Sequence, residues 1–431
     1  MSVKPPASGS TTPPRTAATR VQSLRTASGI EIWHVEDYTV PVLSVEFAFL
    51  GGAAQDPAGR TGLANLLAGL MDEGAGALSS QEFQEALEDK AIELSFDAGR
   101  DRLGGSLRTL AENAASAFAL LGTAILSPRF DPDAIERVRS QIVSGLKRDE
   151  SDPNSRVRDA LNALAFPGHS YGRSEDGTIA ELAEITRDEL CRQHTRLFAR
   201  DALRIVAVGA MAPDDLIKAV ESAFGALPAK AELTPILPIT MQGGGHREII
   251  DLDIPQSTLY LALPGIGRKD PAHMPAMVLN HILGGGSFTS RLWTEVREKR
   301  GLAYSVWSML ASRSHSALFL AGTATSNERV AESLDVILSE IAGIADKGAS
   351  ADELDKAKRF LMGSYALRFD TSRKIAHQLL EIRVEDLGID YIDRRNDEVE
   401  AVSLAQMQEV GTRLFSNVKP LIVVAGQPQG L

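Results

Sequence analysis

Two periodicities of apolar residues divide the chain into predicted strands and helices. Val45, Phe47 and Phe49 alternate with smaller or polar residues, which is the pattern of a strand with one buried face. This pattern predicts two paired strands over residues 29–40 and 41–50. Further strands of this half are predicted at residues 94–97, 103–110 and 202–210.

Apolar residues at helical spacing predict helices between these strands. Residues 62–71, GLANLLAGLM, indicate an apolar helix, and amphipathic helices are predicted over residues 111–126 and 132–150. Another helix is predicted to begin at Ser79, because Glu82 is placed for a reciprocal capping box. Strands followed by runs of helices imply an α+β layer in which helices pack on a sheet.

A linker divides the chain into two similar halves. Residues 228–245 are rich in proline and glycine, which is typical of a connection between domains. After this linker the order of predicted elements starts again, and Ser350 and Glu353 predict a second capping box. The second set of strands is predicted at residues 247–252, 258–263, 304–310, 317–324 and 420–425.

These patterns predict an α+β protein of two homologous α/β repeats, each of about two hundred residues, which is a usual domain size. The predicted domains are residues 21–227 and 246–431. Residues 1–20 are rich in proline, serine and threonine and are predicted to be a disordered arm. They contain no apolar core of a signal peptide. We therefore expect a cytoplasmic protein, or a periplasmic one if a signal peptide was removed before residue 1.

The composition excludes several classes of protein. Hydrophobic residues make up 44% and charged residues 24% of the 431 residues, which is a normal balance for a soluble globular chain. The formal net charge of -12 argues against nucleic acid as a partner. No apolar run is long enough to span a membrane. Cys191 is the one cysteine, so an internal disulfide and a cysteine metal cluster are both excluded.

The stretch from His281 to Tyr304, HILGGGSFTSRLWTEVREKRGLAY, carries the candidate chemistry. Its three glycines interrupt an apolar helix, and a charged helix follows that contains Arg297. Gly301 is predicted to end this helix, because glycine tolerates the left-handed conformation that a helix end often requires. Tyr304 then begins a strand. A hairpin of this kind could point Arg297 and Tyr304 at one cleft, although a surface helix followed by an edge tyrosine is the plainer interpretation.

The whole stretch resembles one family of enzymes. Its motifs, listed here in order, are Gly284-Gly285-Gly286, Ser290-Arg291-Leu292, Arg297-Glu298-Lys299 and Gly301-Leu302-Ala303-Tyr304. They look like the C-terminal half of the pitrilysin-type, or inverzincin, zinc peptidases, in the branch of mitochondrial processing peptidase and its bacterial relatives. The resemblance implies mostly antiparallel sheets covered by helices, with the two repeats arranged as a clamshell half. It also implies that Arg297 binds the substrate backbone and that Tyr304 stabilises the oxyanion, across from the zinc.

The zinc motif of that family is missing from this chain. Catalytic members carry H-x-x-E-H on the helix that begins here near residue 62, with two histidines on one helix face and a glutamate as general base. The resemblance places Asn65, Ala68 and Gly69 at these positions. The family's third ligand, a carboxylate on a later helix, falls in residues 141–146, which end at Ser144, Gly145 and Leu146. The eight histidines show no pair at metal-ligand spacing. We therefore predict no metal and no other cofactor in this chain.

These observations favour a non-catalytic, substrate-binding subunit of a heterodimeric zinc metallopeptidase. A homologous partner would carry the zinc, and this chain would supply Arg297 and Tyr304 to the shared site for peptide substrates. Two alternatives stay open. One is a structural subunit of a larger assembly, like the core proteins of the respiratory chain. The other is a stand-alone peptide-binding protein.

Overall fold

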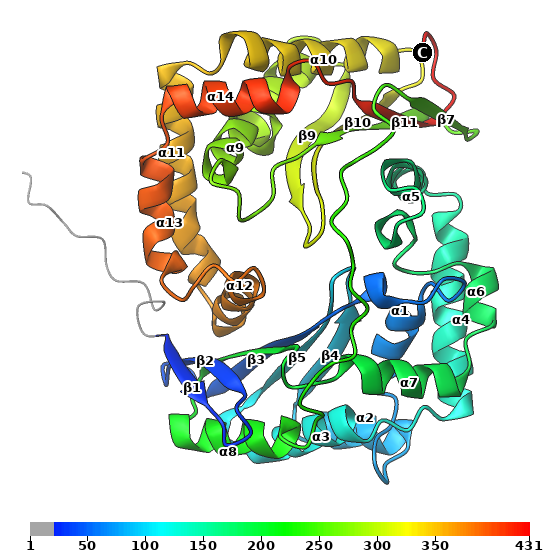
Figure 1. Ribbon diagram of the computed structural model, residues 1–431, viewed down its shortest axis with the longest axis vertical. Helices are drawn as coiled ribbons and strands as arrows, with labels where there is room; N and C mark the ends of the chain where they lie inside the picture. The colour runs from blue at the N-terminus through cyan, green and yellow to red at the C-terminus, as the bar shows by residue number, and fades with distance from the viewer. Residues whose placement is uncertain (1–20) are drawn as a thin grey trace, which may run out of the picture.

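The computed structural model describes residues 21–431 and places two sheets one above the other (Figure 1). The predicted disordered arm, residues 1–20, lies outside the described residues. The first sheet has the order β1-β2-β6-β3-β5-β4, and the second has the order β7-β11-β8-β10-β9. The strands of the first sheet are β1 (Gln22–Arg25), β2 (Glu31–Glu36), β3 (Val42–Leu50), β4 (Glu93–Ala98), β5 (Arg102–Leu110) and β6 (Leu203–Gly209). Those of the second are β7 (Arg247–Asp251), β8 (Gln256–Pro264), β9 (Ala303–Ser312), β10 (Ala317–Ser326) and β11 (Leu421–Gly426).

The two sheets repeat one topology. In each, a single parallel pair, β2 with β6 or β7 with β11, adjoins a set of antiparallel strands. Without β1 the two strand orders coincide, β2, β6, β3, β5 and β4 matching β7, β11, β8, β10 and β9. This confirms the prediction of two homologous repeats with mostly antiparallel sheets.

One predicted pairing is wrong. Residues 29–40 and 41–50 were expected to pair with each other, but β6 lies between β2 and β3 and pairs with both. The reason lies in the sequence of β6, where the consecutive residues Ile205, Val206, Ala207 and Val208 are all fully buried. A strand that is apolar on both faces is stabilised at the centre of a sheet, where both faces are covered.

Helices cover both sheets. Those of the first half are α1 (Leu63–Ala68), α2 (Ser80–Glu88), α3 (Ala114–Leu126), α4 (Pro132–Asp149), α5 (Pro153–Ala165), α6 (Ile179–Ala183), α7 (Arg187–Leu197) and α8 (Pro213–Phe224). Those of the second are α9 (His273–Asn280), α10 (Val330–Lys347), α11 (Ala351–Tyr365), α12 (Ser372–Val384), α13 (Tyr391–Glu400) and α14 (Leu404–Phe415). Both predicted capping boxes are present, Ser79 with Glu82 and Ser350 with Glu353. None of the helices within residues 21–431 has the length and apolar character needed to cross a bilayer.

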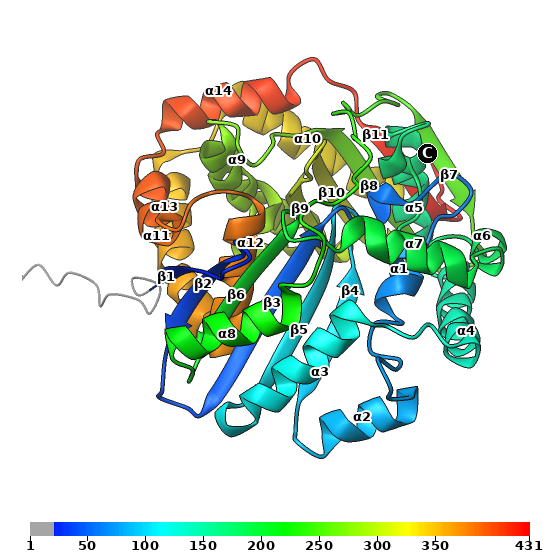
Figure 2. The ribbon, with the colours of Figure 1, turned by 60° about the horizontal axis from the view of Figure 1, so that its bottom comes forward.

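Each half sends one helix onto the sheet of the other half. Helix α5 packs on β8 and β11 through Val157 and Leu161, and α12 packs on β3 and β6 through Ile375 and Leu379. Figures 1 and 2 show α12 lying beside the first sheet although it belongs to the second half of the chain. From α12, Arg383 donates hydrogen bonds to main-chain carbonyls of the first sheet. Helices α5 and α12 therefore pack across the predicted boundary at residues 228–245.

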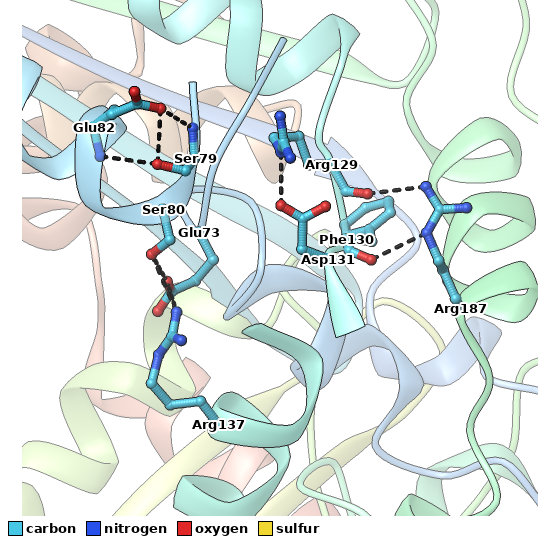
Figure 3. Close-up of polar contacts among 9 residues, drawn as sticks. All are labelled: Glu73, Ser79, Ser80, Glu82, Arg129, Phe130, Asp131, Arg137 and Arg187. Atoms are coloured by element: carbon cyan, nitrogen blue, oxygen red, sulfur yellow. Dashed lines mark hydrogen bonds and ion pairs between the residues drawn. The ribbon is translucent and has the colours of Figure 1, made fainter. Parts of the chain in front are cut away.

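Polar contacts hold the outer helices of the first half in place (Figure 3). Arg187 of α7 donates to the carbonyl oxygens of Arg129 and Phe130 at 3.0 and 3.1 Å, in the turn that leads into α4. From α4, Arg137 pairs with Glu73, which follows α1. Helices α1 and α4, the elements that would carry the family's zinc ligands, are therefore fixed relative to each other.

Candidate functional site

Apolar packing occupies the place of the zinc motif on α1. Ala68 is only 3% exposed and belongs to the core of the first half. A Cβ atom added at Gly69 would lie 2.9 Å from Cγ1 of Val138 on α4, closer than real Cβ contacts. Asn65 is half-buried, and its side-chain amide donates to Asp176 at 3.4 Å. The three positions thus lack zinc ligands, and two of them have closed against neighbouring side chains.

The remaining part of the family's metal site is also without ligands. On α4 the hydroxyl of Ser144 donates to the carbonyl oxygen of Ser140 at 2.7 Å, within its own helix. Within residues 21–431, no group of three or more histidine, cysteine, aspartate or glutamate side chains is arranged to hold a metal ion. Whether the purified chain is free of zinc stays a prediction.

The predicted hairpin of the second half is present, with unusual geometry. Two π-helical segments, η5 (His281–Gly285) and η7 (Trp293–Glu298), flank the short turn η6 (Ser287–Thr289). Gly301 ends the helix with a φ of 57° and donates to the carbonyl oxygen of Arg297 at 2.9 Å. Strand β9 follows, with Tyr304 as its second residue. Short π-helical segments are rare and often occur at functional sites.

A β-bulge places Tyr304 on the surface. In the pairing of β9 with β10, Ala303 opposes Thr325 and Ser305 opposes Ala324, so that Tyr304 has no partner in the register. Bulges re-aim side chains and are frequent beside active sites. The side chain of Tyr304 is 81% exposed. Because β9 is the edge strand of its sheet, this residue lies at the border of the second half.

The structure brings Arg297 and Tyr304 into contact. The guanidinium carbon of Arg297 lies 4.6 Å from the centre of the Tyr304 ring. It also lies 4.1 Å from the centre of the Trp293 ring. Sequence reasoning missed Trp293, although its position four residues before Arg297 on a predicted helix indicated a side-chain pair. The proposed catalytic roles of Arg297 and Tyr304 stay predictions.

Arg297 differs from the other cations of this segment. Arg291 pairs with Glu353, and both Lys299 and Arg300 pair with Glu295. Across the described part of the chain, no carboxylate lies within ion-pair distance of Arg297, whose printed contacts are the two aromatic rings. A cation–π contact does not occupy the N–H donors as an ion pair with a carboxylate does, so the N–H groups of Arg297 can bind a carbonyl oxygen.

These ion pairs shift the pKa values of the carboxylates that make them. Hydrogen bonds from Lys299 and Arg300 lower the pKa of Glu295. The hydrogen bonds from Arg291 lower the pKa of Glu353 to about 2. Both carboxylates are therefore ionised at neutral pH, and they hold their cations away from other acceptors.

The far end of the β9–β10 hairpin is held by the first half. His315 donates its backbone N–H to the hydroxyl of Tyr171 at 3.0 Å, and that hydroxyl donates to Asp101 at 2.7 Å. Tyr171 is fully buried, and burial raises the pKa of its hydroxyl. Tyr171 thus anchors the far end of the hairpin that carries Tyr304.

Comparisons with known proteins identify the family of the chain. Residues 34–178 match the model described as insulinase, peptidase family M16, and residues 184–361 match the model described as the peptidase M16 inactive domain. Together the two models cover most of the chain. The chain belongs to peptidase family M16. At the positions that the resemblance equates with the zinc motif, this member has asparagine, alanine and glycine.

Relatives of this M16 homologue carry different descriptions. It is 29% identical over 347 residues to a protein of Helicobacter pylori named non-peptidase homolog YmxG, covering 79% of each chain. It is 24% identical to a Bacillus subtilis protein named uncharacterized zinc protease YmxG, covering 92% of this chain and 96% of that one. The crystal structure of a peptidase M16 inactive domain from Pseudomonas fluorescens superposes with a TM-score of 0.89 at 26% identity, over 95% of this chain and 98% of that one.

Proposed function

We propose that the chain is the non-catalytic, substrate-binding subunit of a heterodimeric zinc metallopeptidase. A homologous partner would hold zinc on its own first repeat. This chain would contribute Arg297 and Tyr304 from its second repeat. The peptide would bind between this chain and its partner. The chain alone would cleave no peptide.

One observation carries this proposal. The first repeat has lost every zinc ligand, while the second repeat keeps Arg297 and Tyr304 in contact on a π-helix and a β-bulge. Both irregularities are frequent at functional sites, and an exposed aromatic ring and an arginine without a carboxylate partner add little to the core. Such an arrangement is expected where side chains bind a ligand.

The geometry suggests how each side chain would act. The exposed hydroxyl of Tyr304 can donate a hydrogen bond to a substrate carbonyl oxygen, which strengthens as negative charge develops there. The guanidinium of Arg297 can hold a neighbouring backbone carbonyl and fix the register of the peptide. The partner's zinc would supply the Lewis acid and the activated water.

The first experiment tests the partner. A tagged form of this chain is purified from its own cells, and bound proteins are identified by mass spectrometry. We expect a homologue that carries H-x-x-E-H, and we expect the two purified chains to form a one-to-one complex with zinc-dependent peptidase activity on casein. Recovery of the chain without such a homologue, together with no association at micromolar concentrations, would favour the stand-alone peptide-binding protein.

The second experiment tests the site within that complex. Tyr304→Phe should leave assembly intact and lower kcat by about a hundredfold, as removal of an oxyanion donor typically does. Arg297→Ala should raise KM as well as lower kcat. Lys299→Ala is the matched control, since it removes a cation of the same segment that is paired with Glu295. Full activity in both the Tyr304→Phe and Arg297→Ala complexes would contradict the proposal.

A further inference from the structure

Arg297, Trp293 and Tyr304 form a cation–π stack. The guanidinium carbon of Arg297 lies over both rings, 4.1 Å from the centre of the Trp293 ring and 4.6 Å from that of Tyr304. We propose that Trp293 is a positioning residue, whose ring fixes the plane of the Arg297 guanidinium for a substrate carbonyl. This inference rests on the proposed function and assigns a role to a residue outside the Arg297 and Tyr304 pair.

The argument begins with the freedom of an arginine side chain. Arg297 is partly exposed, and its stem would sample many rotamers in water, with a cost in entropy whenever a substrate fixed one of them. Pre-ordering the side chain removes that cost from binding. A carboxylate would also order it, as Glu353 orders Arg291, but a carboxylate would occupy the same N–H donors that the substrate needs.

Aromatic rings order an arginine without using those donors. A ring attracts the guanidinium through its face, whereas the N–H groups point outward in the guanidinium plane. Of the cations in residues 291–300, Arg297 is the one held by rings, and Arg291, Lys299 and Arg300 are held by carboxylates. The arrangement therefore suits a residue whose side-chain conformation must be fixed while its N–H donors stay available to a substrate.

A second aromatic residue supports Trp293. The ring of Phe288 packs edge-on against it, with centres 4.6 Å apart and an interplanar angle of 72°. Phe288 is itself 71% exposed and lies in the turn before η7. The hydroxyl of Ser290 donates to the carbonyl oxygen of Ser287 at 2.9 Å and accepts from the backbone N–H of Trp293 at 3.4 Å. The turn is thus bonded to the start of the segment that carries Trp293.

The stack can be tested in the isolated chain, without any partner. The chain contains three tryptophans, so labelling with 5-fluorotryptophan gives three fluorine resonances, and the one lost in Trp293→Phe belongs to Trp293. Arg297→Ala should shift that resonance and leave the other two in place, whereas Lys299→Ala should shift none. An unmoved Trp293 resonance in Arg297→Ala would overturn the inference whatever the function of the protein.

Kinetics of the reconstituted complex test the role. Trp293→Leu should lower kcat/KM for casein by about tenfold, mainly through KM, and Trp293→Phe should restore most of that loss because it returns a ring. In an Arg297→Ala background, Trp293→Leu should have no further effect, since a positioning residue acts through the residue it positions. Phe288→Ala should give a smaller loss than Trp293→Leu.

The outcomes separate this inference from the proposed function. A large loss in Arg297→Ala with full activity in Trp293→Leu would overturn the inference and leave the proposed function standing. Additive losses, or a loss that follows weaker assembly, would show Trp293 to be a structural residue and would also overturn it. Full activity in both single variants would overturn the proposed function, and the inference would fall with it.

Discussion

The two repeats build the same helix–strand connection with opposite results. In the first repeat α2 leads into β4 through Ala91, and in the second η7 leads into β9 through Gly301. Both connecting residues have a left-handed backbone, with φ values of 49° and 57°. Counting from them, Leu87 corresponds to Arg297, and Leu94 corresponds to Tyr304.

The corresponding residues differ in what they contact. Leu87 is 4% exposed within the core of the first half, and Leu94 packs against that core. Strand β4 pairs with β5 in regular register, with Leu94 opposite Leu107, whereas Tyr304 is the unpaired residue of a bulge. Thus the first repeat uses the connection for stability, and the second uses it to present an arginine and a tyrosine at the surface.

The two repeats also differ at helix α1, which the resemblance equates with the family's zinc-motif helix. Helix α1 of the first repeat has its motif positions closed by packing, while the second repeat has the exposed stack. One repeat therefore serves as scaffold and the other carries the candidate site. Substitutions can test this division, because the same kind of change should affect stability in one repeat and activity in the other.

The largest effect is expected from rebuilding the family's zinc motif in the first repeat. Asn65→His, Ala68→Glu and Gly69→His together should destabilise the chain by at least about 3 kcal/mol, since a carboxylate would replace a buried methyl group and a new Cβ would press on Val138. Thermal or urea unfolding gives the loss, and elemental analysis of the purified variant should find no stoichiometric zinc.

The control for this variant is Asn65→His alone. Residue 65 is only half-buried, so this single change should cost less than about 1 kcal/mol. A stable triple variant that binds zinc would contradict the view that packing has closed the site. Stoichiometric zinc in the unmodified chain would contradict the prediction that it holds no metal.

The next largest loss of stability is expected from changes in α5 and α12, the helices that pack on the sheet of the other half. Leu379→Ala on α12 removes a fully buried side chain between the repeats and should cost about 2–5 kcal/mol. Leu161→Ala on α5 should cost a similar amount, because α5 makes the reciprocal contact with the second sheet. Each variant should still unfold in one transition, measured by circular dichroism. Two separated transitions in the unmodified chain would show that the repeats do not share their cores.

Much of this architecture could be predicted from local sequence. Alternation in β3, the capping boxes at Ser79 and Ser350, and the helix end at Gly301 are local patterns, and each is present. The insertion of β6 between β2 and β3 and the exchange of α5 and α12 depend on contacts between distant segments. No local periodicity specifies such contacts, because an apolar helix face fits either sheet.

The candidate site divides in the same way. The sequence predicted a hairpin that could point Arg297 and Tyr304 at one cleft, with a surface helix and an edge tyrosine as the plainer interpretation. The two side chains are in contact, and Tyr304 lies exposed on an edge strand. The bulge at Tyr304 could not be predicted, because it depends on the register with β10 rather than on the sequence of β9. The pairing of Arg291 with Glu353 joins residues of two helices, which the sequence places 62 positions apart. Without knowledge of that pairing, the sequence does not reveal that Arg297 lacks a carboxylate partner while the neighbouring cations have one.

A smaller change in stability should distinguish the helix–strand connections of the two repeats. Leu87→Ala should reduce the free energy of unfolding by about 2–3 kcal/mol, because it leaves a cavity in the first core. Arg297→Ala, at the corresponding place, should reduce it by about 1 kcal/mol or less, because it removes two cation–π contacts but leaves no cavity in the core. Urea unfolding of the two variants measures both values. Equal losses in the two variants would mean that Arg297 is part of the structural framework.

The smallest expected effect concerns how the second connection is anchored. Arg291, at the start of its charged segment, donates to Glu353 at 2.6 and 2.8 Å, whereas Gln81, at the corresponding place in the first repeat, bonds Glu85 on its own helix. Glu353→Gln keeps the N-terminal capping box of α11, since glutamine can accept from Ser350 as glutamate does. The substitution therefore removes the charge pair and little else.

The pH dependence gives the sign of this effect. The folded state lowers the pKa of Glu353 from 4.5 to about 2, so its contribution to stability is fully present above pH 4.5 and is lost as the pH falls toward 2. Because the pair is partly exposed to solvent, we expect a contribution of about 1 kcal/mol. The stability difference between the unmodified chain and Glu353→Gln should therefore be constant near neutral pH, shrink below about pH 4.5 and vanish below about pH 2. Asp352→Asn, which breaks an exposed pair with Lys356 on the same helix, is the control and should change stability by less than about 0.5 kcal/mol. A Glu353→Gln difference that persists unchanged at pH 2 would mean that the carboxylate contributes by packing rather than by its charge.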